Sequence, residues 1–173
     1  MQENELKEIG IHEYGVISTT DIPFEQEIRR VCEGNACGLY GTTWACPPAV
    51  GTVEECRAKC LSYKTALVFN AVYPLEDSFD YNGMLRGHGA FKDQCDRFHT
   101  LAKSKFHKFL LLSNEGCKRC KNSTYPSAPC RQPELLFPSL EGFGIQVARL
   151  ADCANIKYIN GQNTVTYFGM FLY

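Results

Sequence analysis

The sequence predicts an α/β fold: one small sheet of about four strands, mostly parallel or mixed, with helices packed on it. Segments rich in β-branched and aromatic residues alternate with segments of helical periodicity, and no long-period repeat interrupts this order. The chain has 173 residues, of which 45% are hydrophobic and 21% charged, so it suits a single domain over residues 1–173. A chain of this size buries a genuine core, so folding alone does not require a metal.

Four segments have the composition of strands. The clearest is 65–73, where Ala-Leu-Val-Phe-Asn-Ala-Val-Tyr is typical of a buried strand. A short apolar run of leucines and the β-branched and aromatic residues near the end of the chain fit the same pattern. The expected strands are 11–18, 65–73, 109–112 and 164–173.

Four helices are expected between these strands. Thr52 and Glu55 form a capping box, which marks a helix start, and Ser139 is placed as the N-cap of another helix. One long helix carries an apolar stripe of Phe91, Cys95, Phe98, Ala102 and Phe106, although Gly87 and Gly89 weaken it. The expected helices are 24–31, 52–63, 80–106 and 139–154.

Six of the ten cysteines have the spacing of metal ligands. They form two groups, Cys32-x4-Cys37-x8-Cys46 and Cys117-x2-Cys120-x9-Cys130. The CxxC pair lets two thiolates converge on one metal, and a proline turn at the end of each group covers the last sulfur with apolar bulk. Each group precedes an expected helix, whose free backbone amides stabilise thiolates.

We therefore expect one metal centre on cysteine-bearing loops at one edge of the sheet, because a parallel or mixed sheet returns its connections to the same edge. The expected metal ligands are Cys37, Cys46, Cys117, Cys120 and Cys130. Cys32 is a further cofactor-binding candidate, as a spare ligand or a ligand of a second cluster.

The other cysteines have a different pattern. Cys56 and Cys60 share a helical face and Cys95 lies in the apolar stripe, so all three are expected in the core. Cys153 stays ambiguous.

The remaining composition excludes several classes of function. The 18 basic and 19 acidic side chains nearly cancel and form no basic stripe, so no nucleic-acid partner is expected. No apolar run is long enough for a membrane helix, and residues 1–8 are charged, unlike a secretory signal. We expect a cytoplasmic protein whose thiols are reduced and bind metal. No Ser/His/Asp set, GxGxxG or phosphate loop is present, and His88, flanked by glycines, is interpreted as a surface-loop histidine.

Two kinds of metal fit four or more thiolates. The wide Cys37-x8-Cys46 spacing favours an iron–sulfur cluster, of the [4Fe–4S] type, over zinc, which prefers two close pairs. A fully ligated cluster implies redox or electron transfer, with a redox partner protein. Zinc would imply a stabilised binding module, and an open iron would imply an enzyme. In an enzyme, Arg131 could hold a small anionic substrate, or it could instead bond loop carbonyls.

Several motifs also resemble a known family. The string from Cys37 to Trp44-Ala-Cys46-Pro-Pro, the CxxC pair, Pro-Cys130-Arg-x-Pro, and the segment 138–147 resemble the family of predicted metal-binding proteins known as domain of unknown function 2284. The resemblance covers nearly the whole chain and implies a cytosolic, cysteine-ligated metal protein with an iron–sulfur cluster and no assigned reaction. The chain departs from the family pattern at Leu140, where Met is usual, and at Gln146, where an acid is usual.

Overall fold

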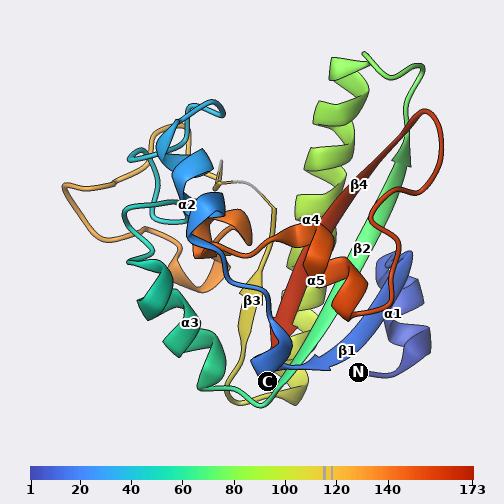
Figure 1. The fold of residues 1–173 in the computed structure, drawn as a ribbon, viewed down its shortest axis with the longest axis horizontal. Coiled ribbons are helices and arrows are strands. Elements are labelled where there is room, and N and C mark those ends of the chain that lie inside the picture. The colour runs from blue at the N-terminus through green and yellow to red at the C-terminus, as the bar shows by residue number, and fades with distance from the viewer. Residues whose placement is uncertain (115, 118) are drawn as a thin grey trace.

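A computed structural model describes residues 1–114, 116–117 and 119–173. Within these residues the chain forms a four-stranded sheet in the order β1-β2-β4-β3, surrounded by helices (Figure 1). The strands are β1 Glu13–Ser18, β2 Thr65–Pro74, β3 Leu110–Leu112 and β4 Thr164–Leu172. The four predicted strands are therefore confirmed, with ends that differ by at most two residues.

The prediction of a mostly parallel or mixed sheet is wrong, because every neighbouring pair of strands is antiparallel. The helix α4, Tyr81–Lys105, does connect two strands of the same direction, β2 and β3. However, β4 is inserted between these two strands and pairs with both of them. The fold thus contains a split β-α-β unit, in which a helical connection does not make its strands neighbours.

Both faces of the sheet are covered, which explains why β2 is apolar at nearly every position. Leu67 and Phe69 contact one core with α4, where the rings of Phe69 and Phe98 stack at 4.8 Å. Val68 faces the other core, which includes Cys56 of α3. Because side chains alternate along a strand, a strand between two cores carries no polar face.

The helices follow the prediction with two differences. The helices are α1 Glu3–Ile9, α2 Gln26–Glu33, α3 Val53–Leu61, α4 and α5 Val147–Cys153. The short helix α1 was not predicted, although its two buried residues, Leu6 and Ile9, are spaced as on one helical face. The helix predicted at 139–154 is divided, because Gly144 adopts a φ of 77° and ends a short 3-10 turn before α5 begins.

The glycines at 87 and 89 do not interrupt α4, so the predicted surface loop around His88 is absent. A Cβ atom at Gly87 would lie 3.1 Å from the ring of Tyr73, so glycine allows the helix to approach β2 closely. His88 is buried in this helix. No described helix combines the length and the apolar character that crossing a membrane requires.

Candidate metal centre

The first cysteine group lies at the end of α2 and in the loop that follows it. Cys32 is in the last turn of α2, Cys37 is exposed, and Cys46 is buried. The loop is folded back on itself, since the amide of Gly41 donates to the carbonyl oxygen of Pro47 at 2.8 Å. Gly41 has a φ of 68°, in the left-handed region that favours glycine.

The second cysteine group lies in the connection after β3, the edge strand of the sheet. Backbone hydrogen bonds hold the two ends of this connection together, because Ser113 at its start pairs with Pro138 and Leu140 at its end. The amide of Ser113 donates to the carbonyl of Pro138 at 2.9 Å, and the amide of Leu140 donates to the carbonyl of Ser113 at 2.9 Å. The long connection is therefore closed at its base, beside the end of β3.

The two cysteine loops are packed against one another. The amide of Ser139 donates to the carbonyl of Ala45 at 3.2 Å, which joins the base of the second loop to the first. A Cβ atom at Gly116 would lie only 2.8 Å from the sulfur of Cys46, so the second loop approaches the first where only glycine fits. Segments about seventy residues apart thus form one lobe, seen beside α2 and α3 in Figure 1.

Trp44 adds a further link between the loops. Its indole N–H donates to the carbonyl of Ala128 at 3.1 Å and lies 3.3 Å from the hydroxyl of Thr124. The edge of its ring also meets Tyr125, with 4.9 Å between the ring centres. The only tryptophan of the chain therefore lies between the two loops.

The second group of cysteines converges on one small cavity. Cys117, Cys120 and Cys130 line it together with Thr43 and Trp44 of the first loop. Gln132 reaches two of these sulfurs: its backbone amide lies 3.4 Å from Cys130 Sγ and its side-chain amide lies 3.9 Å from Cys120 Sγ. Amide donors of this kind stabilise thiolates.

The first group of cysteines is close enough for its charges to interact. Burial, together with the smaller effect of negative charge on Glu141, Cys46 and Cys37, raises the pKa of Cys32 to about 11. Burial also raises the pKa of Cys46, while the hydroxyl of Thr43 opposes that rise. Without metal these thiols hold their protons, so metal binding must release them.

The six candidate cysteines therefore lie in two neighbouring triplets on one lobe. Within the described ranges, no three His, Cys, Asp or Glu side chains already stand close enough to hold a single metal ion. The chemistry of the donors still suits a thiophilic centre. Asn114, two residues before Gly116, has a buried side-chain amide nitrogen with no hydrogen-bond partner among the described residues, and such a donor suits a sulfur acceptor.

The cysteines predicted to lie in the core are buried. Cys56, Cys60 and Cys95 are at most 1% exposed, so this prediction is confirmed. Cys153, which the sequence left ambiguous, is exposed at the end of α5. Arg131 donates to the carbonyl of Asn122 at 3.0 Å. Of the two roles considered for this residue, the structure shows the hydrogen bond to a loop carbonyl.

Sequence reasoning missed Arg29, which supports the first loop. This arginine of α2 is 7% exposed and donates to the carbonyls of Gly51 at 2.6 Å and Gly142 at 2.5 Å. It also lies 3.7 Å from Cys56 Sγ. Arginine is mostly exposed in proteins, and its neighbour Arg30 is exposed, so the sequence offered no signal to separate the two.

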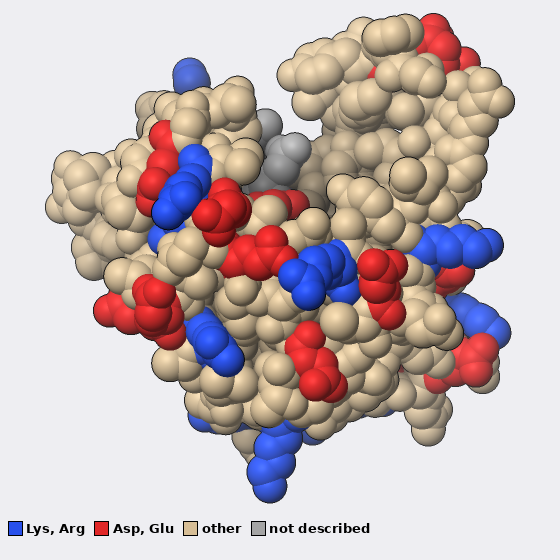
Figure 2. All heavy atoms as spheres, viewed as in Figure 1, with Lys and Arg blue, Asp and Glu red and all other residues tan. Residues whose placement is uncertain are grey.

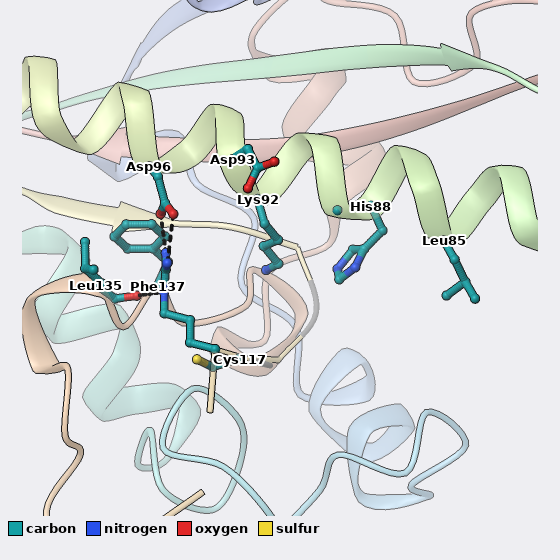
Figure 3. A pocket seen from close by; sticks show the side chains of 10 residues that line it. Leu85, His88, Lys92, Asp93, Asp96, Cys117, Leu135 and Phe137 are labelled. Carbon is teal, nitrogen blue, oxygen red and sulfur yellow. Dashed lines mark hydrogen bonds and ion pairs between the residues drawn. The ribbon is translucent and has the colours of Figure 1, made fainter. Parts of the chain in front are cut away.

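His88 and Lys92 of α4 were also missed as neighbours of the site. Both line a larger cavity that includes Cys117 and Arg119 (Figure 3). The guanidinium of Arg119 forms a two-pronged ion pair with Asp96 of the same helix. Their spacing of four along α4 places His88, Lys92 and Asp96 on one helical face, and this spacing was the available signal.

Comparisons with known proteins give a family and two distant structural likenesses. An epoxyqueuosine reductase from Bacillus subtilis has a TM-score of 0.46 and 12% identity, over 97% of this chain and 43% of that chain. Another structure, of selenomethionine-labelled epoxyqueuosine reductase, has a TM-score of 0.47 and 11% identity, over 97% of this chain and 44% of that chain. The present chain thus spans less than half the length of either. No curated protein matches.

The family comparison agrees with the donor chemistry of the lobe. A family model described as "Predicted metal-binding protein (DUF2284)" matches residues 15–173, which include both cysteine groups, the strands β2, β3 and β4, and most of β1. The chain therefore belongs to the DUF2284 family of predicted metal-binding proteins.

Proposed function

We propose that this chain binds an iron–sulfur cluster of the [4Fe–4S] type on the lobe formed by its two cysteine loops and uses it in redox or electron transfer. The observation that carries the proposal is the close approach of Gly116 to the sulfur of Cys46, 2.8 Å from the position of a Cβ atom. This approach brings the loops that carry the two cysteine groups into contact, which supports a centre that takes thiolates from both.

The donor set favours iron–sulfur over zinc. All six candidate side chains are thiols, and Cys37, Cys46 and Cys130 come from wide spacings rather than from tight pairs. A cube of four irons spreads its ligands over several ångströms, whereas structural zinc draws four ligands close around one ion. When bound, such a cluster supplies one-electron redox chemistry at potentials that the surrounding residues tune.

The surroundings of the cysteines suit an anionic cluster. Trp44 and Thr43 cover the cavity of the second group, and apolar cover of this kind limits the access of water to a cluster. The positive charge of Lys92 acts on Cys46, and that of Arg119 interacts with Cys117. Cationic side chains at this range offset the negative charge of thiolates and inorganic sulfide.

The division of the cysteines into two triplets also allows a variant, in which each triplet supplies three thiolates to its own cluster and one iron of each cluster lacks a cysteine ligand. Cys32, Cys37 and Cys46 interact with one another electrostatically, while Cys117, Cys120 and Cys130 share a cavity. A single shared cluster would use four of the six. The iron content per chain separates the two arrangements, because one cube holds about four irons and two cubes hold about eight.

The partner follows from the chemistry of the proposed centre. A cluster whose irons are all ligated exchanges electrons with a redox partner protein, and this is the partner we propose, in the cytoplasm. A small anionic substrate at an open iron is the alternative. For that role Arg131 would have to give up its bond to the carbonyl of Asn122.

Anaerobic purification tests the proposal directly. The protein should be brown, with broad charge-transfer absorption, and should contain iron and acid-labile sulfide in equal amounts. Cys120→Ser and Cys37→Ser should each lower the iron content, whereas the matched variant Cys153→Ser, an exposed cysteine on α5, should leave it unchanged. A colourless protein with tightly bound zinc and no sulfide would establish the zinc-stabilised binding module instead.

A further inference from the structure

We propose that the cavity between α4 and Cys117 binds a small, mainly apolar ring compound that carries a carbonyl oxygen, as a quinone does. The cavity has a volume of about 430 Å³. Pockets for small organic ligands typically measure roughly 300–1,000 Å³, so a compound of one or two rings fits. This proposal goes beyond electron transfer by the metal centre, and it stands on the cavity rather than on the identity of the metal.

The walls of the cavity indicate the chemical class of the ligand. Leu85, Leu135 and Phe137 supply an apolar surface. In Figure 3 the side chains of His88 and Lys92 extend from α4 into the space above Cys117. Sites for small molecules commonly combine apolar walls with a few polar groups that orient the ligand. The ammonium of Lys92 donates to the hydroxyl of Ser113 at 3.1 Å and to the carbonyl of Asn114, which fixes its position, and a ligand carbonyl would share this donor with them.

The charged pair in the wall does not call for a charged ligand. Arg119 and Asp96 form a two-pronged ion pair, and the guanidinium of Arg119 also donates to the carbonyl of Leu135 at 2.7 Å. The same guanidinium lies over the ring of Phe137, 5.1 Å from its centre. Because Arg119 is committed to these three partners, it forms a fixed part of the wall and holds Phe137 in place.

Gly89 lies on the cavity wall at its open side. Glycine in the middle of a helix lowers its stability relative to alanine, so it calls for a packing reason. Two other glycines of α4 have one: a Cβ atom would lie 2.0 Å from Asp80 at Gly83 and 3.1 Å from Tyr73 at Gly87. A Cβ atom at Gly89 would meet nothing within 4 Å, and Gly89 lines the cavity. Gly89 is exposed, so this side of the cavity opens to solvent and a longer side chain at this position can reach into it.

The surface around the start of α4 is also apolar. Tyr81 and Leu85 are four residues apart, on one helical face, and both are exposed, as is Phe79. Since Leu85 lines the cavity, the apolar surface continues from the cavity to Tyr81. On the face seen in Figure 2, this end of the molecule carries few charged side chains, whereas charges of both signs alternate over the lower part. Such a surface favours approach of an apolar compound.

Calorimetric titration of the oxidised, anaerobically purified protein with duroquinone tests the proposal. Duroquinone carries two carbonyl oxygens, and its fully methylated ring disfavours addition of cysteine thiols. We expect saturable binding to the native protein. Gly89→Leu should fill the cavity and weaken binding by about tenfold or more, without loss of thermal stability, because leucine is a better helix former than glycine. Ala90→Leu, at the exposed neighbouring position, should bind as the native protein does.

Three outcomes would overturn the assignment. They are an absence of binding to the native protein, equal affinity of the native and Gly89→Leu proteins, and tighter binding of benzoate than of duroquinone. Tighter binding of benzoate would show that the cavity binds an aromatic anion rather than a carbonyl compound. Iron, zinc and sulfide are measured on the same samples. Because calorimetry needs no cluster, a zinc-containing protein that binds duroquinone would refute the proposed iron–sulfur function and leave the cavity assignment standing.

Discussion

The indole N–H of Trp44 donates to the backbone carbonyl of Ala128 at 3.1 Å, and this bond joins two loops that are far apart in the sequence. The same N–H lies 3.3 Å from the hydroxyl of Thr124. This side chain therefore links the two loops that carry the six candidate ligands, beside the backbone bond from Ser139 to Ala45 and the contact of Gly116 with Cys46.

Replacing this tryptophan should loosen the lobe. Trp44→Phe keeps an aromatic ring but removes the donor to the exposed carbonyl of Ala128, and loss of an ordinary hydrogen bond costs about 0.5–1.5 kcal/mol. We expect a lower free energy of unfolding and faster transfer of metal to an external chelator. Circular dichroism follows unfolding, since the variant has no tryptophan. Tyr125→Phe, which keeps the ring contact, is the control, and equal rates of metal transfer in the two variants would contradict this role for the indole.

Gly116 should be essential for bringing the loops together. In Gly116→Ala the new methyl group would meet the sulfur of Cys46 and the side chain of Leu39, so the loops must separate. We expect a marked fall in metal content, measured by elemental analysis. Gly34→Ala provides the matched control, because Gly34 is exposed with a φ of −65° and its Cβ atom would lie 3.3 Å from the carbonyl oxygen of Val31, away from any sulfur. Full metal content in Gly116→Ala would show that the two loops do not share a centre.

The buried Arg29 should contribute much more to stability than its exposed neighbour Arg30. Arg29→Met leaves the carbonyls of Gly51 and Gly142 without their donor, and we expect a loss of about 2 kcal/mol or more in the free energy of unfolding. Arg30→Met removes only an exposed ion pair with Glu27 and should cost less than about 0.5 kcal/mol. Urea denaturation measures both, and similar losses would show that Arg29 does not support the loop.

Alanine substitutions should distinguish the core cysteines from the proposed ligand cysteines by their metal content. Cys46→Ala, Cys117→Ala and Cys130→Ala should each reduce metal content, because each removes a thiolate from the proposed centre. Cys95→Ala should keep its metal and lose about 1 kcal/mol of stability, since it deletes a small buried side chain in contact with the Phe91 core. A Cys95→Ala protein that lost its metal while Cys117→Ala retained it would reverse this assignment.

Alkaline pH should destabilise the metal-free protein. Burial raises the pKa of Cys32 from 9.0 to about 11, so the folded state holds this proton more tightly than the unfolded state does. The resulting stability is complete below about pH 9 and is lost as pH rises through about 11. Cys60 and Cys95, whose pKa values burial also raises, add to the same loss. Melting temperatures measured between pH 7 and 11 under reducing conditions should fall less in Cys32→Ser than in Cys153→Ser.

The sequence predicted the elements of the fold better than their arrangement. The capping box of Thr52 and Glu55 forms as expected, because it depends on residues three apart. The direction of the strands depends on which of them become neighbours. Nothing local to β2 or β3 indicates that β4 pairs with both, so the sequence could not show that the sheet is antiparallel.

The candidate site also combines local features that the sequence indicated with tertiary features that it did not. The cysteine spacings and the proline turns indicated two groups of ligand type, and the amphipathic pattern placed Cys56, Cys60 and Cys95 in the core. The contact of Gly116 with Cys46 is a tertiary feature with no local signal. His88 was misassigned because glycines on both sides suggested a loop, whereas Gly87 serves close packing and Gly89 lines a cavity. Which cysteines bind metal stays a prediction.

The position of β4 has a consequence for the order in which the protein matures during synthesis. Both cysteine loops precede β4 in the chain, yet β4 is the strand that joins β2 to β3 and so fixes the edge from which the second loop starts. A nascent chain therefore exposes all six candidate thiols before the sheet that positions them can close. We therefore expect the proposed centre to assemble after β4 has been translated, and until then the emerging thiols are open to oxidation or to capture by other metals.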